Sequence, residues 1–234
     1  MENKNKTPEL NDRDEQKKLK SGQSQLKIES TKILAVEGQD EWYFFKNMLE
    51  KHLKITDVQL IDIGGESNFE TELASIFILS GFSSVKKIGF VRDADNDAQK
   101  AFKKICKAIK DALKLPAPET INNFTNNEPQ IGVFVMPNNI DGGMLEDLCL
   151  QSVQNDTVMP CLDTFISCIR NTLPTDKHPK IWSKVQTQVF LATRKEIKSS
   201  VGFGAEKGYW NFDDPCFDEI KQFLENFRDK NPMQ

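Results

Sequence analysis

Two aspartates that follow a short apolar run are the residues of this sequence best suited to metal chemistry. The run Ile88–Val91 has the composition of a buried strand, and Asp93 and Asp95 follow it, two residues apart. Residues two apart on a strand point to the same side. Two carboxylates this close repel each other unless a cation lies between them. The pattern predicts a site for a hard divalent metal ion, although such a pair in a loop can also form a turn or begin a helix.

Other acids follow the neighbouring apolar runs. Glu37 follows the run at residues 31–36, and Glu146 comes shortly after the run at residues 130–136. In a parallel sheet the carboxyl ends of the strands share one edge, where open α/β sheets bind their ligands. Gly38 would let a substrate or metal approach the backbone beside Glu37. For Glu146, the alternative is an ordinary solvated acid in the first turn of a helix.

The elements that must position these acids alternate along the chain. Apolar runs of strand length occur at residues 31–36, 58–63, 87–91 and 130–136, and helical patterns separate them at residues 40–53, 69–77 and 97–115. This alternation is typical of βαβ units. The sequence therefore predicts an α/β fold with a mainly parallel, four-stranded or slightly larger sheet and helices on both faces.

The composition divides the chain into three parts. Residues 1–28 are polar and charged, and we expect a disordered or loosely ordered tail. Residues 29–153 carry the strands and form the α/β domain. Residues 154–234 show only helical patterns, which predicts a helical C-terminal extension packed on the same domain. Within it, the glycine-rich stretch 201–210 is expected to be a flexible loop.

Composition narrows the class of protein. The 234 residues contain no apolar run of about 20 residues, which a membrane span needs, and the charged N-terminus does not resemble a secretory signal, so we expect a cytoplasmic protein. The 5 scattered cysteines and 2 separate histidines argue against a zinc site or a disulfide framework. A net charge of −4 argues against binding nucleic acid by overall charge alone.

The acidic motifs resemble those of a known family. The segment Leu34–Gly38, followed by Asp40 and by a strand that ends in Asp93 and Asp95, resembles the Toprim domain. This metal-binding catalytic domain is shared by topoisomerases, DnaG-type primases, OLD-family nucleases and small stand-alone proteins. The later segment from Pro137 to Asp147 resembles the additional acidic motif of the OLD-like and stand-alone subset. The resemblance covers residues 31 to about 150.

The resemblance implies roles for individual residues. Glu37 would be the general acid/base or a metal ligand, Asp93 and Asp95 would bind Mg²⁺ or Mn²⁺, and Glu146 would complete a second metal site. Two such ions can activate water and stabilise the leaving oxygen of a phosphodiester. Secondary candidates are Asp40, Gly38 and Asp97, although Asp97 can instead cap its helix.

Lysines near these acids could contact a phosphate backbone. A stripe at helical spacing follows the aspartate pair and consists of Lys100, Lys103, Lys104 and Lys107. It is also what the solvated face of an amphipathic helix looks like. Lys207, in the glycine-rich stretch, would reach a scissile phosphate if that stretch folds over the site, and is otherwise an ordinary surface residue.

Among Toprim-type activities, nuclease chemistry needs the least additional apparatus. A topoisomerase needs an attacking tyrosine and DNA-gate domains, and this sequence has only Tyr43 and Tyr209 and is too short for such domains. A primase normally carries a zinc module, and the sequence shows none. OLD-like enzymes carry an ATPase domain, and this sequence has no Gly-x-x-x-x-Gly-Lys-Ser/Thr loop, so a separately encoded ATPase is a possible partner. We therefore predict a Mg²⁺- or Mn²⁺-dependent nuclease with two ions, acting on DNA or RNA. The alternative is a non-catalytic Toprim-fold module that works with such a partner.

Two further readings of the aspartate pair fit the sequence less well. The metal–nucleotide clamp of a glycosyltransferase leaves Glu37 and Gly38 unexplained. The motif of a haloacid-dehalogenase phosphatase belongs on the first strand of the sheet, and it requires Thr or Val where Asp97 stands.

Overall fold

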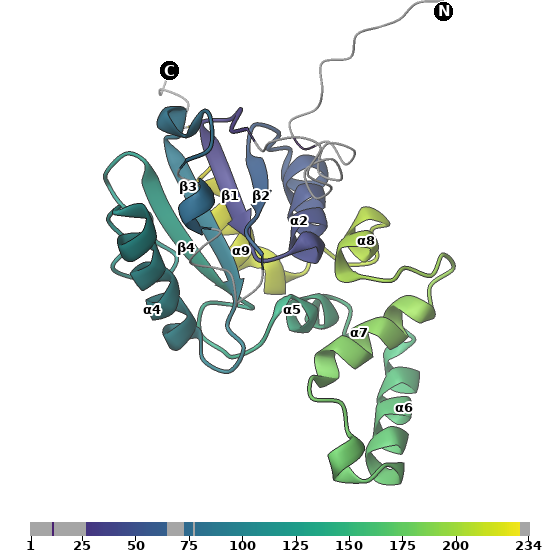
Figure 1. The fold of residues 1–234 in the computed structure, drawn as a ribbon. Coiled ribbons are helices and arrows are strands. Elements are labelled where there is room, and N and C mark those ends of the chain that lie inside the picture. The colour runs from purple at the N-terminus through teal and green to yellow at the C-terminus, as the bar shows by residue number, and fades with distance from the viewer. Residues whose placement is uncertain (1–10, 12–26, 65–72, 77, 230–234) are drawn as a thin grey trace, which may run out of the picture.

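The computed structural model describes residues 11, 27–64, 73–76 and 78–229, and its centre is a parallel sheet (Figure 1). The sheet has 4 strands in the order β2-β1-β3-β4, and each neighbouring pair is parallel. The strands are β1 (Lys32–Val36), β2 (Gln59–Asp62), β3 (Lys87–Asp93) and β4 (Gln130–Met136). This arrangement confirms the α/β class predicted from the sequence.

Helices connect and follow the strands. They are α2 (Gln39–Lys46) with its π-helical continuation η1 (Asn47–Leu53), η2 (Phe82–Ser84), α4 (Ala98–Ala108) with η3 (Ile109–Leu113), α5 (Leu145–Ser152), α6 (Met159–Thr172), η4 (Thr175–Lys177), α7 (Trp182–Ala192), α8 (Val201–Glu206), η5 (Pro215–Phe217) and α9 (Asp218–Glu225). Within the described part of the chain, no helix is long and apolar enough to cross a bilayer.

Helices cover both faces of the sheet, which explains why the strands are continuously apolar. Alternate residues of β1 enter opposite layers: Ile33 and Ala35 pack in the layer that contains α4, whereas Leu34 and Val36 pack in the layer that contains α2, α5 and α9. Figure 1 shows α4 on one side of the sheet and α9 on the other. The lysine-rich side of α4 is exposed, as an amphipathic helix requires.

The C-terminal helix α9 packs directly on the sheet. Its Phe223 ring lies 5.6 Å from the ring of Phe134 on β4. Phe227, which follows α9, lies so close to Gly89 on β3 that a Cβ atom there would be 2.8 Å from the ring. Residues far beyond the last strand thus complete the core of the α/β layer, while α6 and α7 project away from the sheet (Figure 1).

The glycine-rich stretch forms a helix, so the predicted flexible loop is wrong. The side chain of Ser200 caps α8 by accepting a hydrogen bond from the backbone N–H of Phe203. Gly202 allows α8 to lie against α2, because a Cβ atom at this position would be 2.6 Å from the carbonyl oxygen of Asp40. Here the glycine permits close helix packing instead of flexibility.

Parts of two predicted segments lie outside the described residues. Of the expected tail 1–28, the structure describes Asn11, Lys27 and Ile28; Ile28 is buried, and the buried Asn11 amide donates to the Val58 carbonyl at 2.9 Å. These two residues belong to the folded body instead of a solvated tail. Of the helix expected at residues 69–77, Leu73 and Ile76 are buried, whereas Phe69 and Phe77 are not among the described residues.

Candidate active site

Carboxylates from four elements gather at the carboxyl edge of the sheet. Glu37 follows β1, Asp40 and Glu41 lie in the first turn of α2, Asp93 is the last residue of β3, and Glu146 lies in the first turn of α5. The parallel register aligns the ends of the strands, so their acids meet there without unusual backbone geometry. The structure therefore brings together Glu37, Asp93 and Glu146, as expected from the sequence.

Asp93 lies at the centre of this acidic group. Its Oδ1 accepts a hydrogen bond from the backbone N–H of Leu145, the first residue of α5, at 3.1 Å. Burial raises the pKa of Asp93 well above its usual range, and the charges of Glu41, Glu37 and Glu146 raise it further. The Leu145 hydrogen bond opposes this rise but does not offset it.

Glu41 belongs to the group, although sequence reasoning did not select it. Burial, followed by the charges of Asp40, Glu146 and Glu37, raises the pKa of Glu41 to about 7. The pKa of Glu146 is also raised, mainly by burial. An acid in the first turn of a helix is the normal choice beside the positive end of the helix dipole, so Glu41 gave no distinctive signal in the sequence.

Arg92 is the second residue that sequence reasoning missed. Its Nε donates to Oε2 of Glu37 at 3.1 Å and its Nη2 donates to Oε1 at 3.2 Å, a bidentate pair. Only 6% of the Arg92 side chain is exposed. A single arginine in an otherwise apolar strand, directly before an aspartate, was the available signal, because a buried guanidinium needs an anionic partner.

Asp95 does not continue the strand, contrary to the expectation that it would point to the same side as Asp93. Its φ of +53° places it in the left-handed region, and its N–H donates to the carbonyl of Gly143 at 3.1 Å. Because β3 ends at Asp93, the alternation of a strand no longer applies. The Asp95 side chain is exposed.

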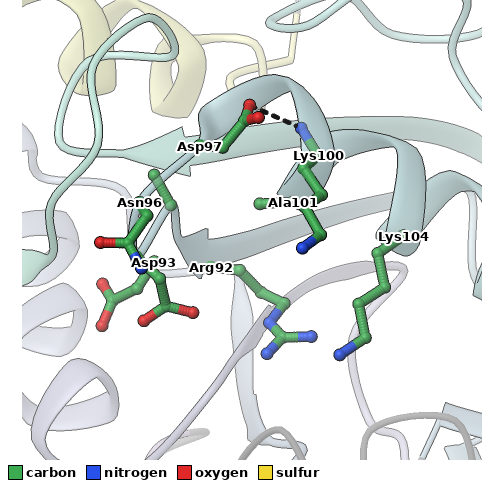
Figure 2. A pocket seen from close by; sticks show the side chains of 9 residues that line it. Arg92, Asp93, Asn96, Asp97, Lys100, Ala101 and Lys104 are labelled. Atoms are coloured by element: carbon green, nitrogen blue, oxygen red, sulfur yellow. Dashed lines mark hydrogen bonds between the residues drawn. The ribbon is translucent and has the colours of Figure 1, made fainter.

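Asp97 serves as the N-cap of α4. Its Oδ1 accepts a hydrogen bond from the backbone N–H of Lys100 at 3.0 Å (Figure 2). This is the capping alternative foreseen from the sequence. Gly38 has an extended backbone, with φ of −158°, and a Cβ atom there would be 2.9 Å from Oε2 of Glu41. The space left by Gly38 thus accommodates the Glu41 carboxylate.

Two clefts adjoin the acidic group. The first has a volume of about 680 Å³ and is lined by Arg92, Asp93, Ala94, Asp95, Asn96, Asp97, Lys100, Ala101 and Lys104. Figure 2 shows the guanidinium of Arg92 and the side chain of Lys104 extending into the same region. The second, of about 490 Å³, is lined by residues that include Asp40, Glu41, Glu146, Lys184, Ser200 and Phe203. Asp93 in the first cleft is thus electrostatically coupled to Glu41 and Glu146 in the second.

The expected cations are only partly at the site. Lys100 and Lys104 line the first cleft, whereas Lys103 and Lys107 are exposed on α4 and line neither cleft. Lys207 is bound elsewhere: its Nζ lies 2.6 Å from Oε2 of Glu196, and it also lines neither cleft.

Lys184 on α7 approaches the acids from the C-terminal helices. Its Nζ lies 3.9 Å from Oε1 of Glu146, and its side chain is half-exposed. Its distance from the strands in the sequence left no pattern that would connect it with the acids.

The donor chemistry of the edge fits a hard divalent cation. Carboxylate oxygens are the ligands that Mg²⁺ and Mn²⁺ prefer. Burial, and after it the negative charge of neighbouring acids, raises the pKa values of Asp93, Glu41 and Glu146, and a bound cation would favour their ionised forms. As placed here, no three His, Cys, Asp or Glu side chains of the described residues lie close enough together to bind an ion. Binding would therefore require the carboxylates to turn toward a common point.

Comparisons of this chain with known proteins place it in a protein family. Curated protein sequences yield no match. Among solved structures, the chain is similar to the C-terminal region of the Xanthomonas campestris pv. campestris OLD protein, with 12% identity and a TM-score of 0.46 over 85% of this chain and 94% of that chain. The family model described as "Protein of unknown function (DUF3226)" matches residues 31–229, and the chain therefore belongs to that family.

Proposed function

We propose that the protein is a nuclease that uses Mg²⁺ or Mn²⁺ to hydrolyse phosphodiester bonds of DNA or RNA. The observation that carries this proposal is the gathering of carboxylates from the ends of β1 and β3 and from the first turns of α2 and α5 at the carboxyl edge of the sheet, where burial and neighbouring acids raise the pKa values of Glu41, Asp93 and Glu146. The resemblance of the sequence motifs to a Toprim domain supports the same chemistry.

Glu41, Asp93 and Glu146 would bind the metal, and Asp95 and Asp40 lie beside them. When bound, the cation would supply charge for the developing oxyanion and a more acidic water. The Leu145 N–H orients the Asp93 carboxylate, which limits the positions that a metal-binding oxygen can take. By resemblance, Glu37 would be the general acid/base or a further ligand.

In this proposal the first cleft would bind the phosphate backbone of the nucleic acid. Arg92, Lys100 and Lys104 line it beside Asp93 and Asp95. A protein with a net charge of −4 has to bind a phosphate backbone through local cations of this kind. The second cleft adds Lys184 on the other side of the acids.

A second candidate function is a non-catalytic Toprim-fold module that binds nucleic acid or a partner, such as a separately encoded ATPase. The observation that favours it is the engagement of both Glu37 carboxylate oxygens by Arg92. A carboxylate held in this way is less available for proton transfer than a free one.

Cleavage of supercoiled plasmid distinguishes the two functions. We expect the purified protein with Mn²⁺ to nick or linearise the plasmid, and Asp93→Ala and Glu41→Ala to lose this activity. Asp163→Ala, a change of an exposed acid on α6, is the matched control and should cleave like wild type. Cleavage by Asp93→Ala at the wild-type rate would exclude the proposed site. Binding of DNA without cleavage by wild type would favour the module.

A further inference from the structure

A side chain from the N-terminal part of the sequence is bonded to one edge of the sheet. Among the described strands, β2 lies at an edge and pairs with β1 alone. An edge strand directs part of its backbone N–H and C=O groups away from the sheet, where another strand can pair with them. Two such groups, the carbonyl of Val58 directly before β2 and the N–H of Leu60, are bonded to Asn11.

The side-chain amide of Asn11 imitates a peptide unit of an additional parallel strand. Its Nδ2 donates to the Val58 carbonyl and its Oδ1 accepts from the Leu60 N–H, both at 2.9 Å. In a parallel ladder, a residue of the neighbouring strand makes the same two bonds, one to each residue flanking the one opposite it. Asn11 therefore occupies the position opposite Gln59 that a further strand would take.

Helix α2 and its continuation η1 complete the surroundings of Asn11. Lys46 Nζ donates to the backbone carbonyl of Asn11, and Asn11 Nδ2 donates to Oε1 of Glu50 at 3.4 Å. Asn11 is only 2% exposed. The Leu60 carbonyl accepts from Nε1 of Trp42 at 3.2 Å, so α2 closes the edge beyond this point and leaves room for one amide. We call this place the amide seat, and its residues are Lys46, Glu50, Val58 and Leu60.

The amide seat selects an uncharged group that both donates and accepts. An aspartate in place of Asn11 would not donate to the Val58 carbonyl, and it would bring a second carboxylate beside Glu50. The seat lies within the range that the family model matches, whereas Asn11 lies outside it. The seat is therefore part of the domain, and its occupant comes from a segment beyond the domain, as in recognition of an extended peptide at a sheet edge.

We propose that the amide seat is a docking site for an extended polypeptide segment that carries an asparagine, and that Asn11 of the chain's own N-terminal segment fills it. A tethered occupant has an effective concentration on the order of millimolar. A segment of another protein would therefore bind at this edge only by displacing Asn11. The N-terminal segment thus acts as a built-in competitor for partners of this kind.

Hydrogen exchange of single backbone amides, followed by NMR, tests whether Asn11 occupies the seat. We expect Asn11→Ala to speed exchange of the Leu60 amide by at least about tenfold, because this N–H loses its acceptor. Asn11→Leu keeps the size of the side chain without its hydrogen bonds and should have the same effect. The Ile63 amide, which donates to the Val36 carbonyl at 2.9 Å, is the internal control and should exchange as in wild type.

Addition of a separate peptide tests whether the seat is a docking site. A peptide of residues 6–16, added at millimolar concentration to the Asn11→Ala protein, should restore slow exchange of the Leu60 amide. The same peptide with Asn11→Ala should not restore it. Wild-type protein should bind the peptide at least about tenfold more weakly than the variant, because its own Asn11 competes. Asn171→Ala, at an exposed position on α6, is the matched protein control and should behave like wild type.

Each outcome decides the inference, and none depends on metal binding or on plasmid cleavage. Equal exchange of the Leu60 amide in wild type, Asn11→Ala and Asn11→Leu would show that Asn11 does not fill the seat. Loss of protection without rescue by the peptide would reduce Asn11 to an internal bond of the fold and overturn the docking site. Rescue by both peptides would overturn recognition of the asparagine. Rescue by the asparagine peptide alone would support the proposal.

Discussion

Replacement of Glu41 by glutamine is expected to stabilise the metal-free protein at alkaline pH. Burial and the neighbouring acids raise the pKa of Glu41 from 4.5 to about 7. Each pKa unit corresponds to about 1.4 kcal/mol, so ionised Glu41 costs the folded state roughly 3 kcal/mol, or about 2–3 kcal/mol after partial screening by water.

The direction of the pH dependence follows from the sign of this shift. Between pH 4.5 and about 7, the folded protein retains a proton that the unfolded chain has released, so the free energy of unfolding falls as the pH rises through this window. Glutamine cannot ionise. Glu41→Gln should therefore increase the free energy of unfolding by about 2–3 kcal/mol at pH 8 and by less than about 1 kcal/mol at pH 5.

Urea unfolding at pH 5 and pH 8, followed by circular dichroism with a chelator present, measures both values. Glu119→Gln, at an exposed position, is the matched control and should change neither value appreciably. An equal gain at both pH values would show that the effect of glutamine is not due to removal of the charge. The absence of any gain at pH 8 would refute the raised pKa of Glu41 in the folded protein.

Two further changes separate structural from functional roles. Asp97→Ala removes the side chain that caps α4, so we expect a loss of about 1 kcal/mol in the free energy of unfolding by urea, with plasmid cleavage retained; loss of cleavage at unchanged stability would instead make Asp97 a site residue. Lys184→Ala removes a half-exposed partner of Glu146, so stability should change by less than about 1 kcal/mol while cleavage falls about tenfold or more. Unchanged cleavage by Lys184→Ala would show that the second cleft does not contact substrate.

The acids at strand ends could be found from the sequence because local patterns encode them. A buried strand of a parallel sheet is continuously apolar, so its end is visible where acids begin, as at Glu37 and Asp93. Topology then places such ends at one edge. The role of Asp97 as a helix cap could also be predicted from the local sequence, because an N-cap residue contacts residues within the first turn of its own helix.

Contacts between segments that are distant in the sequence could not be predicted from local patterns. The pair of Glu37 and Arg92 joins residues 55 positions apart, and Lys184 reaches Glu146 from a separate helix. Lys207 seemed better placed only because its surroundings are rich in glycine; the glycines instead let α8 pack against α2. A composition that permits flexibility also permits close packing, and only the neighbouring helix decides between them.

By itself, the sequence determined the α/β class, the four strands and the acidic character of the edge at which Glu37, Asp93 and Glu146 lie. These features follow from the periodicity of side chains and from the position of residues along single elements. Tertiary structure alone decided that Glu41 joins the acids, that Arg92 compensates Glu37, and that Asp95 turns away from the strand. The reason is that charge coupling and burial depend on distances between elements, which no local pattern specifies.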